Sequence, residues 1–183
     1  MEEIKIEENK YYWIWFSLIE NLGVKRKQIL LNKYKTPKKI YNLSKEELLT
    51  NKGFGESIVN NILDKKIKEQ IFYHINYMEK NNIGLINIQD NDYPKILKEI
   101  YDPPISLYIK GNKKILNNNC ISIIGCRECT NYGKMSTKYF AYNLSKKGNT
   151  IVSGLAKGID SYAHIGCMCA KRKYNCSLRK WLR

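Results

Sequence analysis

The fold of this chain is decided by one stretch near its C-terminal end: Ile151-Val152-Ser153-Gly154-Leu155-Ala156-Lys157-Gly158-Ile159-Asp160-Ser161-Tyr162-Ala163-His164. A short apolar strand runs into a turn of small residues, and a helix begins at Asp160 or Ser161. Glycine is needed where a backbone takes a positive φ or approaches another group closely. A turn that leads into a helix N-terminus presents N–H groups and the positive end of the helix dipole. The stretch therefore predicts a site for phosphate or another anion.

A second stretch of the same kind lies about 30 residues earlier, which is the length of one βαβ unit. It reads Ile121-Ser122-Ile123-Ile124-Gly125-Cys126-Arg127. Residues 121–125 predict an apolar strand that is buried on both faces of a parallel sheet. Residues 134–147 predict a helix with Met135, Tyr139 and Leu144 facing inward. Strand, helix and the strand at 150–153 predict a right-handed crossover in an open α/β sheet, with both glycine loops beyond the carboxyl ends of the strands.

Residues 1–78 predict a small all-α domain. Apolar residues recur at helical spacing from Tyr12 onward, and Pro37 stands near the start of a short helix. Ser44 and Glu47 predict a capping box, and a glycine turn at 52–55 precedes a helix from about 56 to 76. The order resembles the SAM-like and helix-hairpin-helix group, whose glycine turns contact DNA phosphates. A bundle used only for docking is the favoured interpretation.

Net charge and the lack of a long apolar run limit the classes of function. The formal charge is +15, which favours an acidic partner such as nucleic acid. Six of the positive charges lie in the last 13 residues, and the remainder is still basic. A solvated lysine-rich surface explains the charge equally well. The sequence has neither a signal peptide nor an apolar run of bilayer length, so we expect a cytoplasmic protein without membrane association.

The six cysteines do not favour a metal site. Cys126-x-x-Cys129 and Cys167-x-Cys169 have the spacing of a four-thiolate zinc site. However, the first pair falls on a predicted strand-to-helix turn and the second in a predicted helix. Without a secretory signal, disulfides are not expected either. The sequence therefore predicts ordinary thiols and no metal.

Three motifs in order resemble a known family, and together they cover residues 80–170. The first runs from Tyr93-Pro94 through Asp102-Pro103-Pro104 to Gly111, the second is Ile124-Gly125-Cys126-Arg127 with Tyr132-Gly133, and the third runs from Val152 to Gly166. They resemble the DNA-processing protein A (DprA/Smf) family. The resemblance implies an incomplete Rossmann-like parallel sheet of the extended DprA type in residues 79–170, preceded by the SAM-like domain.

The resemblance also implies a function and a site. The family binds and protects single-stranded DNA, loads the RecA recombinase during natural transformation, forms homodimers and catalyses no reaction, with no cofactor. A GxR turn places a guanidinium beside backbone N–H groups, which suits phosphate. The DNA-contact positions carried over are Gly125, Arg127, Ser153, Gly154, Lys157 and Gly158. The family usually has Ser where this chain has Cys126, which is a weaker donor.

Other residues near the loops have two interpretations. Asp160 and His164 are spaced i and i+4 on one helix and could act as acid and base. No nucleophile accompanies them, so Asp160 as a helix N-cap and His164 as a packing residue is the favoured interpretation. Tyr132, Tyr139 and Tyr142 could stack on bases, although the helical position of Tyr139 favours the core.

The resemblance stops at Ala170, and residues 171–183 show no clean helical or strand period and no acidic residue. Back-translation with chosen codons, read one base later, gives K-E-N-T-I-A-V-L-G-N-G-L, which restores the next strand and glycine turn of the family. The Gly from the Trp181 codon is forced in that frame. The sequence therefore predicts a frameshift near residue 171 and an out-of-frame tail. We expect such a product to aggregate and to bind DNA poorly, because its sheet edge is unpaired.

Two alternative functions remain open from sequence alone. Nucleotide-processing phosphoribohydrolases of the lysine-decarboxylase-like group share a GxR loop and a later glycine-rich loop. Their PGGxGTxxE signature does not occur in this chain. A helix-hairpin-helix accessory module is the third hypothesis, but it leaves the motifs of residues 93–166 unexplained.

Overall fold

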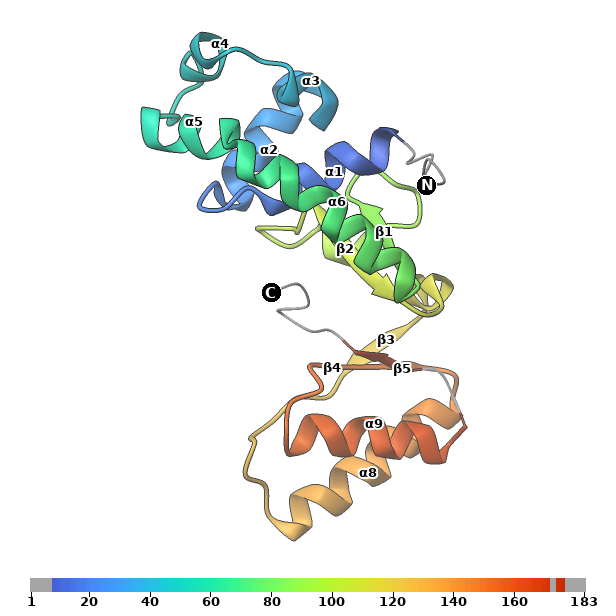
Figure 1. Ribbon diagram of the computed structural model, residues 1–183. Helices are drawn as coiled ribbons and strands as arrows, with labels where there is room; N and C mark the ends of the chain where they lie inside the picture. The colour runs from blue at the N-terminus through green and yellow to red at the C-terminus, as the bar shows by residue number, and fades with distance from the viewer. Residues whose placement is uncertain (1–7, 172–173, 177–183) are drawn as a thin grey trace. The chain divides into compact units, whose positions relative to one another are not determined.

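The computed structural model describes residues 8–171 and 174–176. The chain divides into two compact units, Met1–Gly111 and Asn112–Arg183, which are described separately. Six helices open the first unit (Figure 1): α1 (Glu8–Leu18), α2 (Gly23–Tyr34), α3 (Pro37–Tyr41), α4 (Lys45–Leu49), α5 (Glu56–Leu63) and α6 (Lys65–Lys80). Among the described residues, every helix is too short or too polar to span a bilayer.

Local capping sets the ends of these helices. Pro37 occupies the first turn of α3, as the sequence predicts. The predicted capping box is present at α4, where Ser44 Oγ accepts the N–H of Glu47 and the Glu47 carboxylate accepts the N–H of Ser44. The helix predicted over 56–76 is two helices, because Asp64 takes an extended conformation and its carboxylate caps α6 at the N–H of Lys66.

A hairpin completes the first unit. Strand β1 (Ile83–Asn87) pairs antiparallel with β2 (Ser106–Lys110), and the short helix α7 (Lys95–Lys98) lies between them in the chain. An isolated two-stranded hairpin is marginally stable. Here Ile83 and Ile105 join the core that α1 to α6 form around Trp13, Trp15 and Phe16. The compact division after Gly111 thus differs from the boundary at 78/79 expected from sequence.

The second unit is a βαβαβ arrangement of β3 (Cys120–Ser122), α8 (Asn131–Lys146), β4 (Thr150–Ser153), α9 (Ile159–Cys169) and β5 (Tyr174–Cys176), preceded by the 3-10 helix η1 (Lys113–Asn117). The strands are parallel in the order β3-β4-β5, with Ile151 opposite both Ile121 and Tyr174. Both helices cover the same face of the sheet (Figure 1). This confirms the predicted α/β class with a parallel, Rossmann-like sheet.

Close packing of α8 on α9 explains two wrong predictions about burial. A Cβ on Gly166 of α9 would lie 2.6 Å from the Lys138 carbonyl oxygen and 2.9 Å from Ala141 Cβ. The inner face of α8 is therefore made of small residues: Thr137, Ala141 and Ser145. Met135 and Tyr139, predicted to face inward, are 72% and 65% exposed.

The strand after residue 119 also differs from its prediction. It was expected over 121–125 with both faces buried, but β3 ends at Ser122 and Ile124 is 75% exposed. Helices cover one face of the described sheet, and β3 is at its edge. An apolar run in such a place is not enough to ensure burial.

The tail contains a strand that the sequence did not predict. Tyr174–Cys176 forms β5, with Asn175 opposite Val152 of β4. Residues 174–176 therefore form a strand although the sequence of the tail shows no clean strand period. The other residues of the proposed out-of-frame tail, except Lys171, lie outside the described residues.

Candidate nucleic-acid interface

Two loops meet at the carboxyl ends of neighbouring parallel strands. One follows β3 and contains Gly125 and Arg127, and the other follows β4 and contains Lys157 and Gly158. Ile159 N–H donates to the Cys126 carbonyl oxygen at 3.2 Å, which ties the start of α9 to the first loop. The sequence-predicted loops are thus brought together.

Gly158 is required at this junction for two reasons. Its φ is +90° and its ψ is −134°, a backbone conformation that costs other residues roughly 1–3 kcal/mol. A Cβ at this position would also overlap the carbonyl oxygens of Cys126 and Arg127. Gly125 is confined as well, because its Cβ would lie 2.7–3.0 Å from side-chain atoms of Ile159.

The backbone N–H groups expected to hold a phosphate are bound by the protein itself. Asp160 Oδ1 accepts the N–H of Gly125 at 3.4 Å, and Oδ2 accepts the N–H of Gly154 at 3.2 Å and of Ala156 at 3.4 Å. The Asp160 side chain is buried, at 7% exposure. Gly158, and not Asp160 as predicted, is the N-cap of α9.

Ser153 faces inward and away from solvent. Its Oγ donates to the Ile123 carbonyl oxygen at 2.7 Å, and the residue is buried. This bond joins the end of β4 to the chain that leaves β3. The Ser153 hydroxyl, one of the six expected DNA contacts, is therefore bonded to the Ile123 carbonyl in this conformation.

Arg127 and Lys157 are the exposed cations of the two loops. Further positive charge lies on α8, where Lys134 and Lys138 place their Nζ atoms 5.9 Å and 5.1 Å from the centre of the Tyr162 ring. Tyr132 and Tyr139 are exposed on the same helix, so the expected core position of Tyr139 is wrong. The surface around the loops combines cations with aromatic rings.

His164 is held in a setting that favours its neutral form. Burial lowers the pKa of His164, while the backbone of Ser153 and the Asp160 carboxylate act in the opposite direction. Asp160 in turn is hydrogen-bonded to backbone N–H groups. Asp160 thus accepts hydrogen bonds from the loop backbone, although it is not the N-cap of α9.

Sequence reasoning also missed the part that Ala156 and Ser161 play in the site. Ser161 Oγ donates to the Ala156 carbonyl oxygen at 2.7 Å, and Ala156 also gives its N–H to Asp160. Ala156 and Ser161 thus fix the backbone of the second loop. In the sequence they are visible only as a small residue before Gly158 and a hydroxyl residue after it.

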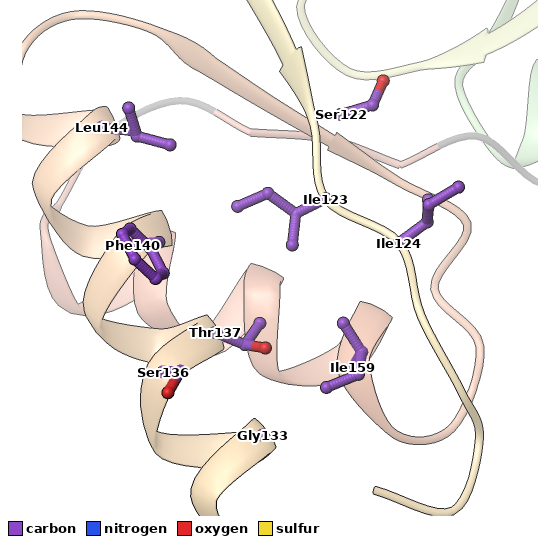
Figure 2. A pocket seen from close by; sticks show the side chains of 9 residues that line it. All are labelled: Ser122, Ile123, Ile124, Gly133, Ser136, Thr137, Phe140, Leu144 and Ile159. Atoms are coloured by element: carbon purple, nitrogen blue, oxygen red, sulfur yellow. The ribbon is translucent and has the colours of Figure 1, made fainter.

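An open hollow of about 520 Å³ lies beside the loops, between the β3 side and α8. It is lined by Ser122, Ile123, Ile124, Gly133, Ser136, Thr137, Phe140, Leu144 and Ile159. Figure 2 shows Ile123 pointing toward Phe140 and Leu144 of α8. The lining is mainly apolar and carries no charged side chain, so the hollow does not extend the cationic surface.

The described thiols and carboxylates near the loops do not form a metal site. Within residues 8–171 and 174–176, no three His, Cys, Asp or Glu side chains are placed to hold a metal ion. Among the described residues, Cys126, Cys129, Cys167 and Cys169 form no disulfide.

A parallel sheet with glycine loops tied together at its carboxyl edge defines a Rossmann-like α/β protein. The sequence profile of the DNA recombination-mediator protein A family matches residues 84–178, and the chain belongs to this family. The matched segment contains all six carried-over positions, and the family prediction is confirmed. The phosphoribohydrolase hypothesis loses its support, because the loops on which it relied lie inside this segment.

Individual relatives agree. The chain is 29% identical over 161 residues to protein Smf of Synechocystis sp., covering 86% of this chain and 40% of the relative. It is 41% identical over 93 residues to DNA processing protein DprA of Bacillus subtilis, covering 50% and 31%. The chain thus spans less than half the length of these curated relatives.

A solved structure shows the same fold. DNA processing protein A from Streptococcus pneumoniae superposes with a TM-score of 0.62 at 23% identity, covering 92% of this chain and 57% of that one.

Proposed function

We propose that this chain binds single-stranded DNA through the two loops at the carboxyl ends of β3 and β4. The observation that carries the proposal is that Arg127 and Lys157, both exposed, stand on loops that the Ile159–Cys126 hydrogen bond ties together. Two cations carried by joined loops at one sheet edge suit the phosphates of a nucleic-acid strand. Membership of the recombination-mediator family supports DNA as the partner.

The six carried-over residues divide the work in this proposal. Arg127 and Lys157 contact phosphate, Arg127 through its planar fork and Lys157 as a point charge. Gly125 and Gly158 allow the loops to lie against each other. Ser153 and Gly154 hold the end of β4, through Ile123 and Asp160 respectively.

Aromatic rings favour a single strand over a duplex. Tyr132 and Tyr139 are exposed on α8, which begins at the loops. Unpaired bases stack on such rings for roughly 1–3 kcal/mol each, whereas duplex bases are already stacked. The rings would therefore add affinity for single strands, on top of the phosphate contacts.

The wider role follows the family. In our proposal the complete activity is protection of single strands and loading of the RecA recombinase in natural transformation, by a homodimer and without catalysis. Family membership and the relatives named DNA processing protein support this role.

The test is binding of a fluorescent oligothymidylate and of a duplex of equal length by the 183-residue chain across a salt series. We expect weak binding that prefers the single strand and decreases linearly with the logarithm of salt concentration. Equal affinity for both forms, or no salt dependence, would contradict the proposal.

A further inference from the structure

The two loops converge on a carboxylate that belongs to the protein. This carboxylate is the side chain of Asp160. Its Oδ1 accepts the N–H of Gly125 in the first loop, and its Oδ2 accepts the N–H groups of Gly154 and Ala156 in the second loop. We propose that Asp160 is the resident anion of this N–H cradle and positions the DNA-binding loops. Phosphate is then recognised by the Arg127 and Lys157 side chains, outside the cradle. The part about DNA rests on the proposed function.

A carboxylate fits this position better than any other side chain. Three donors must be matched, and they approach two different oxygen atoms from two different segments of chain. An ionised carboxylate offers acceptors only, whereas an amide of the same shape would turn an NH₂ group toward N–H donors. Asp160 also lies in the first turn of α9, where the helix dipole favours a negative charge.

The surroundings keep an outside anion from the cradle. Asp160 is 7% exposed. Its neighbour Ser161 fastens the Ala156 carbonyl at 2.7 Å, and Leu155 between two of the donors is held at a φ of +54°. A left-handed φ at a leucine persists only where the surrounding bonds impose it. The Asp160 bonds on either side of Leu155 are such bonds.

The proposal makes a prediction opposite in sign to simple electrostatics. Removing a negative charge from a DNA-binding surface would by itself strengthen DNA binding. If Asp160 positions the loops, its removal must weaken binding despite the more positive charge, because the loops that carry Arg127 and Lys157 lose the carboxylate that joins them. If Asp160 contributed only to global stability, added anions would not restore the amide protection that Asp160→Ala loses.

The first experiment uses the unaltered chain, labelled with nitrogen-15, and titrates it with sodium phosphate while backbone amide signals are recorded. We expect the amides of Gly125, Gly154 and Ala156 to keep their positions, because their acceptor is already present. A saturable shift of these three signals would overturn the proposal, since it would show phosphate entering the cradle.

The second experiment compares Asp160→Ala with the matched control Ser161→Ala, which loosens the same loop but leaves the carboxylate. In Asp160→Ala we expect the three amides to exchange with solvent roughly tenfold faster. Added sodium acetate should slow that exchange, because it supplies the missing carboxylate. The control should not respond to acetate. No response in Asp160→Ala, or an equal response in Ser161→Ala, would overturn the proposal.

Asp160→Asn keeps the side-chain volume and serves if the alanine variant does not fold. We expect roughly tenfold weaker oligothymidylate binding by Asp160→Asn than by the unaltered chain, and unchanged or tighter binding would overturn the positioning role. If the unaltered chain binds no DNA while its amides behave as described, the proposed function fails and the cradle assignment stands.

Discussion

Gly158 lies directly against the backbone carbonyl of Arg127, so that any side chain at residue 158 would overlap it. This places the β4–α9 loop on the β3–α8 loop with no room between them. Gly158 is the N-cap of α9, and Arg127 carries the guanidinium that we propose binds phosphate. The position of the Arg127 backbone therefore depends on how closely the two loops pack.

The first prediction tests that contact with two glycine substitutions. Gly158→Ala combines a positive φ with overlap, whereas Gly148→Ala has a similar φ of +88° and nothing within 4 Å of its Cβ. We expect Gly148→Ala to lower the free energy of unfolding by about 1 kcal/mol and Gly158→Ala to lower it by several kcal/mol. Urea denaturation measures both. Equal losses would show that the overlap is relieved without cost.

The second prediction concerns the buried amine of Lys27, which is 8% exposed and donates to the Ser17 carbonyl at 2.9 Å. Burial lowers the pKa of Lys27 from 10.5 to about 8. Between pH 8 and 10.5 the unfolded chain holds a proton that the folded chain has released. Stability from this group therefore rises with pH across that window.

At pH 7 the Lys27 amine is charged in both states, and burying it costs the fold. We expect Lys27→Met to be about 1–3 kcal/mol more stable than the unaltered chain at pH 7, with a difference that shrinks by pH 10. The exposed Lys39→Met serves as control. Thermal melts at pH 7, 8, 9 and 10 give the curve, and an increasing advantage of Lys27→Met toward pH 10 would contradict the sign. Burial raises the pKa of Tyr93 to about 12, so the range stops below that transition.

Particular residues show how far sequence reasoning reached. The capping box at Ser44 and Glu47, the proline at the start of α3 and the strand at 150–153 follow from local chemistry, and the structure confirms them. The break at Asp64 was missed because apolar residues continue at helical spacing on both sides of it. Tyr139 was misplaced because periodicity does not show which face of a helix meets a small-residue neighbour such as Gly166.

The candidate site was predicted in part. The loops and their glycines were found, because glycine patterns report backbone conformation directly. The use of the Asp160 carboxylate as the ligand of the loop N–H groups was not found. That arrangement depends on how two segments separated by a helix approach each other, which spacing along one segment does not reveal.

The third prediction concerns self-association. Ile124, Met135 and Phe140 are large apolar side chains exposed in the second unit, and β3 is at the edge of the described sheet. Exposed apolar surface beside a strand edge promotes association. We expect Ile124→Lys to reduce aggregation, whereas Ile29→Lys on α2, also at an exposed isoleucine, leaves it nearly unchanged. Light scattering over a concentration series measures the aggregation of both variants. Equal effects of Ile124→Lys and Ile29→Lys would show that the surface around Ile124 has no special part in self-association.

The fourth prediction returns to the tail, whose frameshift origin stays a proposal. In the alternative frame T-I-A-V-L begins at codon 174, and β5 begins at Tyr174. A strand ladder joins backbone groups, so it accepts either set of side chains. Sequencing the gene across codon 171 should reveal an A-rich run followed by a family-like continuation in the shifted frame. Absence of that continuation in either other frame would end the proposal.

The central claim is that Arg127 and Lys157 contact phosphates, and salt dependence tests it most directly. For single strands the slope of log affinity against log salt is about −0.7 per phosphate neutralised. We expect Arg127→Ala and Lys157→Ala each to reduce the magnitude of the slope by roughly 0.7. Lys147→Ala, at the other end of α8, should leave it unchanged. Unchanged slopes for both loop variants, or an equal reduction in Lys147→Ala, would contradict the account.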